Sequence, residues 1–241
     1  MSTLTQAINL MENTFRENIT VAADDFGISK TANETILRLA ESKKIDRVAI
    51  MAFGVITQEE AAKLKASGVK LDLHLDILHE YDQERREQRS SAILRGLGFL
   101  YKFLSGKISP KKILPDWENQ LVKFQELFGN SPDGINSHEH VHFFPAYFKL
   151  ALELAKKHDI EYIRLGKQGD LKLKPVSFIL NFLRKVDLKN LKKSGLNSSD
   201  FLISIDWIKD FETFLKTSKQ KTELVCHPEN SQEAELIEKY L

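Results

Sequence analysis

The sequence predicts an α/β protein in which about seven parallel strands form a closed or nearly closed barrel. Apolar, strand-like runs alternate with amphipathic helical patterns along the whole chain. This alternation is typical of parallel strands joined by crossover helices. The 241 residues, 42% of them hydrophobic, are enough for one sizeable core. We therefore expect a single domain over residues 17–241, preceded by an N-terminal extension over residues 1–16 that carries no motif.

The strand candidates are short, mainly apolar runs, and polar side chains follow or lie near the ends of most of them. Val, Ile and Phe, which favour strands, recur in most of them. In chain order the candidates are Ile19–Ala23, Arg47–Phe53, Lys70–Ile77, Gly134–Ser137, Tyr162–Leu165, Phe201–Ile205 and Glu223–Cys226.

Helix candidates follow most of the strands, and several have recognisable ends. Ser29 can cap a helix that runs to about Lys43. Gly129 suits the position just after a helix, and Pro145 suits the first turn of one. In order, the helix candidates are Ser29–Lys43, Gln58–Ala66, a broken stretch over Glu84–Leu104, Trp117–Phe128, Pro145–Lys157, Ser177–Lys193, Trp207–Leu215 and Ser231–Tyr240.

Two long, basic and amphipathic stretches interrupt the strand–helix rhythm, namely Tyr81–Pro115 and Gly169–Ser199. We expect them to form helical insertions over the mouth of the barrel, with Lys and Arg facing water. The alternative is a surface for lipid-linked or polyanionic substrates.

Composition narrows the class of protein. Lys and Arg total 35 and Asp and Glu 34, and this near-neutral balance argues against a nucleic-acid partner. The single cysteine, Cys226, excludes an internal disulfide and suits a reducing compartment. Met1–Glu17 does not resemble a signal peptide, and no apolar run is long enough for a transmembrane segment. We expect a soluble cytoplasmic protein.

Polar side chains occur at the ends of strands that are far apart in the sequence. In a parallel α/β barrel the carboxyl ends of all strands open on one face, so such residues converge on one pocket. The residues at these ends are Asp24, Asp25, His74, His138, His140, His142, Arg164 and His227.

This set of residue types fits a metal-dependent hydrolase. One carboxylate and two imidazoles can hold a metal ion and leave a position open for water. A second carboxylate can take a proton from that water, and an imidazolium can protonate the leaving amine. Asp24 and Asp25, His74, one central histidine and His227 supply these groups.

The order and spacing of these motifs resemble the YdjC-like carbohydrate deacetylases, which include chitooligosaccharide deacetylases and hopanoid-associated members. The resemblance extends from about Ile19 to Glu229. The motifs that carry it are Ala23-Asp24-Asp25-Phe26-Gly27, Leu73-His74-Leu75, Gln120 through Phe128-Gly129, Pro132, Ser137-His138-Glu139-His140-Val141-His142 with Pro145, Ile163-Arg164 and Cys226-His227-Pro228.

The resemblance implies a distorted TIM-like barrel that removes acetyl from an N-acetylated sugar with the help of one divalent metal ion. It implies that Asp25, His74 and His138 bind the metal. Asp24 is then the general base, which Arg164 orients or polarises, and His227 is, or assists, the general acid. Magnesium is the usual family metal, but this ligand set fits zinc at least as well. Family members are often dimers, so a homodimer is expected by analogy.

The sequence departs from the family pattern around His74. Asp72 and Asp76 stand where the family usually has Gly and Thr, and they share a strand face with His74. Either carboxylate can fix the His74 tautomer or bind an amine or hydroxyl of the substrate. His140 and His142 are candidates for substrate binding, for support of the metal site, or for holding their loop together.

Two other functions stay open. A non-catalytic carbohydrate-binding protein can keep the same fold, and the changed surroundings of His74 favour that alternative. A metal hydrolase of another amide or ester is also compatible with the residues. Arg164 can be a simple ion-pair residue at a strand end.

Overall fold

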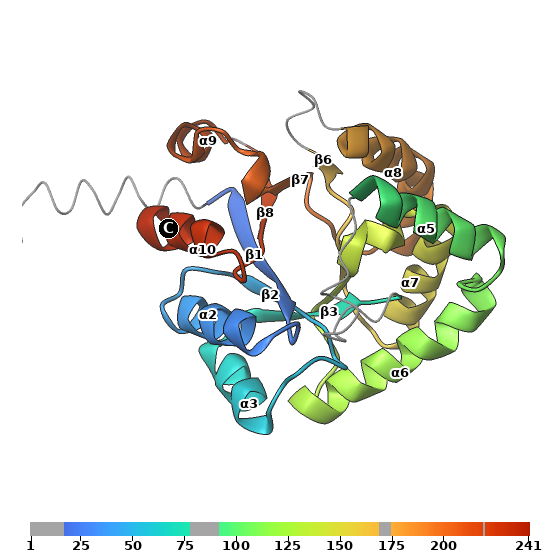
Figure 1. The fold of residues 1–241 in the computed structure, drawn as a ribbon, viewed down its shortest axis with the longest axis horizontal. Helices are drawn as coiled ribbons and strands as arrows, with labels where there is room; N and C mark the ends of the chain where they lie inside the picture. The colour runs from blue at the N-terminus through green and yellow to red at the C-terminus, as the bar shows by residue number, and fades with distance from the viewer. Residues whose placement is uncertain (1–16, 78–91, 169–174, 219) are drawn as a thin grey trace, which may run out of the picture.

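In a computed structural model of the chain, residues 17–77, 92–168, 175–218 and 220–241 are described. Eight parallel strands form one sheet in the order β5-β4-β3-β2-β1-β8-β7-β6. The sheet curls into a half-barrel with helices around it, so the predicted distorted TIM-like architecture is confirmed (Figure 1). The predicted extension, residues 1–16, lies outside the described residues.

The strands agree with the candidates to within a few residues at each end. The exception is β6, a two-residue strand that none of the candidates covers, since two polar residues give no periodic signal. The strands are β1 (Ile19–Phe26), β2 (Arg47–Ile50), β3 (Lys70–Leu75), β4 (Gly134–Ser137), β5 (Tyr162–Ile163), β6 (Lys167–Gln168), β7 (Phe201–Ser204) and β8 (Thr222–Cys226).

The helices begin and end largely where their caps predict. The Ser29 side chain accepts a hydrogen bond from the backbone N–H of Ala32, and Gly129 ends its helix in the left-handed region. The helices are α2 (Lys30–Glu41), α3 (Gln58–Ser67), α5 (Ala92–Leu104), α6 (Pro110–Phe128), the 3-10 helix η1 (His138–Phe143), α7 (Pro145–Lys157), α8 (Pro175–Ser194), the 3-10 helix η2 (Ile205–Trp207), α9 (Phe211–Thr217) and α10 (Ser231–Tyr240).

Two helix predictions need correction, and a third falls only partly within the described residues. The helix expected from Trp117 begins at Pro110 and includes Pro115. The single helix expected over Trp207–Leu215 is instead η2 followed by α9. Part of the broken helix expected from Glu84 lies outside the described residues. None of the described helices has the length and apolar character needed to span a bilayer.

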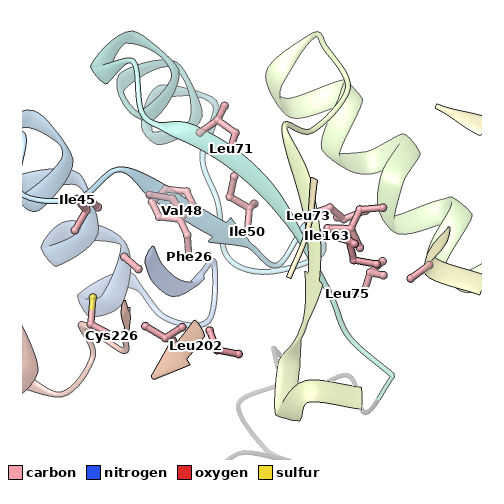
Figure 2. Packing of buried hydrophobic residues seen from close by; sticks show 14 of the residues in the cluster. Phe26, Ile45, Val48, Ile50, Leu71, Leu73, Leu75, Ile163, Leu202 and Cys226 are labelled. Atoms are coloured by element: carbon pink, nitrogen blue, oxygen red, sulfur yellow. The ribbon is translucent and has the colours of Figure 1, made fainter. Parts of the chain in front are cut away.

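The two faces of the sheet have opposite chemistry. Leu71, Leu73 and Leu75 are buried in the core that the sheet shares with the surrounding helices (Figure 2). Because side chains alternate along a strand, Asp72 and His74 point to the other face. That face lines the barrel interior, where charged side chains from non-adjacent strands meet, as described below. The apolar core therefore lies outside the barrel, and the polar groups lie inside it.

Two glycines bring the loops after β1 and β2 into contact. Gly27 has a φ of 103°, and the backbone N–H of Val55 donates to its carbonyl at 2.7 Å. A Cβ on Gly54 would lie 2.2 Å from the Gly27 carbonyl oxygen. Only a residue without a side chain fits there, and this contact fixes the turn that follows Asp24 and Asp25.

We expect Gly54→Ala to lower the free energy of unfolding by about 1–3 kcal/mol, the usual cost of forcing an extra methyl group into a packed site. Urea denaturation followed by circular dichroism measures the change. Gly98→Ala is the control, since a Cβ at that helical position meets nothing within 4 Å. Equal stability of Gly54→Ala and wild type would show that the loop contact is not constrained.

Candidate active site

A β-bulge turns two consecutive carboxylates toward one cavity. Neighbouring side chains on a regular strand point to opposite faces, so Asp24 and Asp25 could not both reach a site inside the barrel. The pairing of β1 with β2 shifts register between Ala23 and Phe26, and Asp25 has a φ of 70°. Bulges next to active sites commonly redirect a side chain in this way. Both aspartates line the cavity as a result.

The structure brings the three predicted metal ligands together. Asp25 Oδ1 lies 3.1 Å from His74 Nε2 and 2.9 Å from His138 Nδ1. The three candidate ligand atoms all lie within 4.8 Å of one another, and all three residues are buried. They come from β1, β3 and η1, whose first residue follows the end of β4. Their meeting point is at the carboxyl edge of the sheet.

The hydrogen bonding of these residues suits a cation. The Asn136 side-chain oxygen pairs with His74 Nδ1, so that nitrogen carries the proton and Nε2 presents a lone pair. That lone pair faces the Asp25 carboxylate, which is also an acceptor. Burial raises the pKa of Asp25, but His138 and His74 outweigh it and hold the pKa well below its usual range. One ionised carboxylate and two imidazoles fit zinc or another transition ion at least as well as magnesium.

Asn136 is a positioning residue that sequence reasoning missed. We expect Asn136→Ala to weaken metal affinity about 10–100-fold, because partners that orient a ligating histidine typically contribute that much. Competition with a fluorescent chelator measures the affinity, and Asn130→Ala, at an exposed site, is the control. Unchanged affinity would mean that His74 needs no partner to hold its ring.

Asp24 is held by a fully buried arginine. Arg164 Nη1 and Nη2 donate to Asp24 Oδ2 and Oδ1 at 2.6 and 2.9 Å. Arg164 Nε donates to Glu223 Oε1 at 2.7 Å, and the Tyr162 hydroxyl donates to Glu223 Oε2. Burial raises the pKa of Asp24, but the guanidinium of Arg164 outweighs it, so the pKa is lowered. Arg164 is thus both an ion-pair residue and a fixed clamp on the predicted base.

His227 also lines the cavity and is supported by Glu233 of α10. The Glu233 carboxylate accepts the backbone N–H of His227 at 2.8 Å and lies 3.6 Å from its Nδ1. Burial would lower the pKa of His227, but Glu233, Asp25 and Asp24 raise it to about 9. The imidazole is therefore protonated at neutral pH, as a proton donor must be.

The cavity between these groups has a volume of about 150 Å³. His140 lies in its wall, and its Nδ1 is buried without a hydrogen-bond partner among the described residues. Burial and the Arg164 charge lower the pKa of His140 to about 3, so the ring is neutral. The cavity is lined by Asp24, Asp25, His74, Ser137, His138, Glu139, His140 and His227.

His142, predicted to bind substrate, holds the backbone instead. The carbonyl oxygen of Arg164 accepts from its Nε2 at 2.6 Å, and its Nδ1 accepts from the Ser137 hydroxyl at 2.7 Å. Both ring nitrogens are therefore used, and the ring is fully buried. His142 therefore fixes the segment that carries His138. This matches the third role considered for His142, that of holding its loop together.

Asp72 and Asp76 are not in the cavity wall. Asp72 is fully buried and forms a bidentate ion pair with Arg47, at 2.8 Å to its Nε. Asp76 follows β3, and Gln120 pairs with its backbone N–H and carbonyl. Asn136 is the residue that pairs with His74 Nδ1, a role considered for either aspartate. The carboxylate of Asp72 thus pairs with Arg47, whose side chain is largely buried, and does not line the cavity.

The partners Asn136, Glu223 and Glu233 were missed for different reasons. Asn136 lies two residues before His138, on a strand that ends at the predicted site, so strand alternation could have found it. Glu223 is fully buried on β8. A glutamate indicates a paired or functional role only when it is known to be buried, and the sequence does not show its burial. Glu233 lies on a helix, and only the fold brings it to His227.

The fold and the site together define an α/β half-barrel protein with a metal-type Asp-His-His cluster at the carboxyl edge of its sheet. A sequence model of the family described as YdjC-like protein matches residues 18–239, and the chain belongs to this family. The chain also shares its fold with a crystal structure from Enterococcus faecalis, named for a proposed role in cellobiose-phosphate cleavage. The TM-score is 0.55 at 18% identity, over 87% of this chain and 80% of the other.

Curated relatives are similar over part of their length. A mouse protein named carbohydrate deacetylase is 23% identical over 62% of this chain and 51% of its own length. A chitooligosaccharide deacetylase of Escherichia fergusonii is 29% identical over 62% of this chain and 59% of its own. A chitooligosaccharide deacetylase of Serratia marcescens is 27% identical over 61% and 59%. The chain thus aligns with about half to three fifths of these proteins.

Proposed function

We propose that this protein is a metal-dependent hydrolase that removes the N-acetyl group from an amino sugar or a short oligosaccharide. The observation that carries the proposal is the convergence of Asp25, His74 and His138 around one point, beside Asp24 and His227. The names of the relatives support the same reaction class.

The residues of the site divide the chemistry between them. A divalent ion held by Asp25, His74 and His138 would supply Lewis acidity for water activation and for the amide carbonyl. Asp24, fixed by Arg164, accepts the proton of the attacking water at a carboxylate oxygen. His227 donates a proton to the departing nitrogen of the sugar amine. His140 offers an unpartnered ring nitrogen to a substrate hydroxyl or carbonyl.

The competing functions predict different measurements. The test is incubation of metal-free protein with zinc or magnesium and acetylated chitobiose, followed by mass spectrometry of the sugar and a free-amine assay. Loss of one acetyl group with a metal present supports the proposal. Release of another acyl group, or of phosphate, from a wider set of amides and esters favours a different metal hydrolase. Sugar binding without metal uptake favours the non-catalytic alternative. Cytoplasmic location and a homodimer stay predictions.

The pH dependence offers a separate check on His227. A general acid must be protonated, so the rate falls as pH rises through its pKa. Burial lowers the pKa of His227, and Glu233 is the first of the groups that raise it to about 9. We expect Glu233→Gln to move the alkaline limb of kcat/KM to lower pH. Glu235→Gln, on the same helix, is the control. An unchanged alkaline limb would show that the Glu233–His227 pair does not control proton donation.

A further inference from the structure

The two helical insertions present large apolar side chains to water. Among the described residues, eleven large hydrophobic side chains are exposed, and eight of them lie on α5 and α8. Scattered exposed apolar residues are ordinary, whereas a cluster marks an interaction surface. The expectation that only Lys and Arg face water on these insertions is therefore incomplete. The eight residues, here called the insertion face, are Leu100, Tyr101, Phe103, Leu104, Phe178, Ile179, Phe182 and Val186.

Both helices of the insertion face rest on α7. The rings of Phe99 and Phe103 lie 6.0 and 6.1 Å from the ring of Tyr147. The helix α8 packs against α7 and also against η1, which carries His138 and His140 of the cavity. Figure 1 draws α5, α7 and α8 on one flank of the barrel. The insertion face therefore adjoins the segment that forms one wall of the candidate active site.

The insertions concentrate the positive charge of the chain. Residues 92–112 contain five basic and no acidic residues, and residues 175–194 contain five basic residues and Asp187. These segments carry +5 and +4 while the whole chain carries +1, which leaves −8 for the remainder. Asp187 is buried, so the exposed surface of α8 is entirely basic in its charged groups. In the described part of α8, Lys185 and Lys189 are exposed.

Apolar and basic residues follow one another along the same side of α8. Phe178, Phe182 and Val186 are spaced by one helical turn, and Lys189 and Lys193 continue the row. A helix that lies in a lipid–water interface has this composition, with aromatic and aliphatic groups in the acyl boundary and lysines at the phosphates.

We propose that the insertion face docks on the surface of an anionic lipid bilayer. Charge decides between this occupant and a second copy of the chain. A two-fold contact would place the basic insertions of both copies against each other, which opposes association. Anionic headgroups instead pair with the lysines while the apolar side chains enter the interface. Docking would hold the cavity close to the membrane, so that lipid-anchored molecules could enter it.

The test is flotation of the full chain with phosphatidylcholine vesicles, with and without phosphatidylglycerol. We expect binding to the phosphatidylglycerol vesicles, and weaker binding as salt is added. Phe178→Ser with Phe182→Ser should reduce it about tenfold or more, because two large apolar groups no longer leave water. Lys189→Gln with Lys193→Gln should reduce it about fivefold per charge.

Matched variants and two contrary outcomes make the test decisive. Val122→Ser removes a half-exposed apolar side chain on α6, and Lys30→Gln with Lys63→Gln removes two charges from α2 and α3. These controls should bind like wild type. No flotation with phosphatidylglycerol vesicles, or flotation that the Phe variants leave intact, overturns the proposal. A dimer by light scattering that the Phe variants dissociate, without vesicle binding, would assign the face to self-association instead.

Discussion

Asp24→Asn is expected to abolish nearly all turnover while metal binding stays intact. The asparagine keeps the size of the side chain but cannot accept the proton of the attacking water, and loss of a general base costs about 10²–10⁴-fold in rate. Asp25, His74 and His138, the three residues proposed to hold the ion, are unchanged by the substitution. Initial rates on an acetylated chitooligosaccharide and metal content by mass spectrometry measure the two effects separately.

Asp159→Asn is the matched control for this prediction. Asp159 is exposed and has a φ of 55°, a conformation that asparagine also tolerates. The deacetylation rate of Asp159→Asn should therefore equal that of the wild type. Full activity of Asp24→Asn would remove Asp24 from the mechanism. Loss of the bound ion would show instead that Asp24 takes part in holding it.

Arg164→Met is expected to lower the free energy of unfolding by about 3–5 kcal/mol at neutral pH, the typical result of breaking a buried ion pair. Arg164 is fully buried and pairs with both Asp24 and Glu223. In the wild type the guanidinium outweighs the effect of burial on Asp24, so without it burial raises the pKa of that carboxyl group above its value in the unfolded chain. The loss of stability should therefore shrink as the pH falls and Asp24 becomes protonated.

Urea denaturation at several pH values measures this effect. Arg164→Lys keeps the charge without the bidentate geometry and should fall between Arg164→Met and wild type. Arg38→Met is the surface control, since the exposed pair of Arg38 with Glu238 should contribute less than about 1 kcal/mol. A stability deficit that does not depend on pH would mean that lost packing, not uncompensated charge, is the cause.

The sequence predicts more of the architecture than of the site. Strand runs and helix caps locate most elements, because apolar periodicity and capping act over a few residues. The resemblance to the YdjC-like family, which rests on motifs at or near the ends of predicted strands, also implies that Asp25, His74 and His138 are the metal ligands. The sequence cannot show that Asp72 neutralises Arg47, because the pairing of β2 with β3 brings these two residues together. Nor can it show the β-bulge at Asp25, which depends on how β1 pairs with β2.

Side chains of the candidate site and side chains of the apolar core alternate, residue by residue, along β3. His74 faces the barrel interior, whereas Leu73 and Leu75 lie in the apolar core on the other side. A deletion or insertion of one residue within β3 would reverse this parity, placing leucines among the charges and an imidazole among the helices. Point substitutions on opposite faces, by contrast, are expected to act independently. Evolution can therefore retune specificity inside the barrel without repacking its exterior, provided that strand lengths never change.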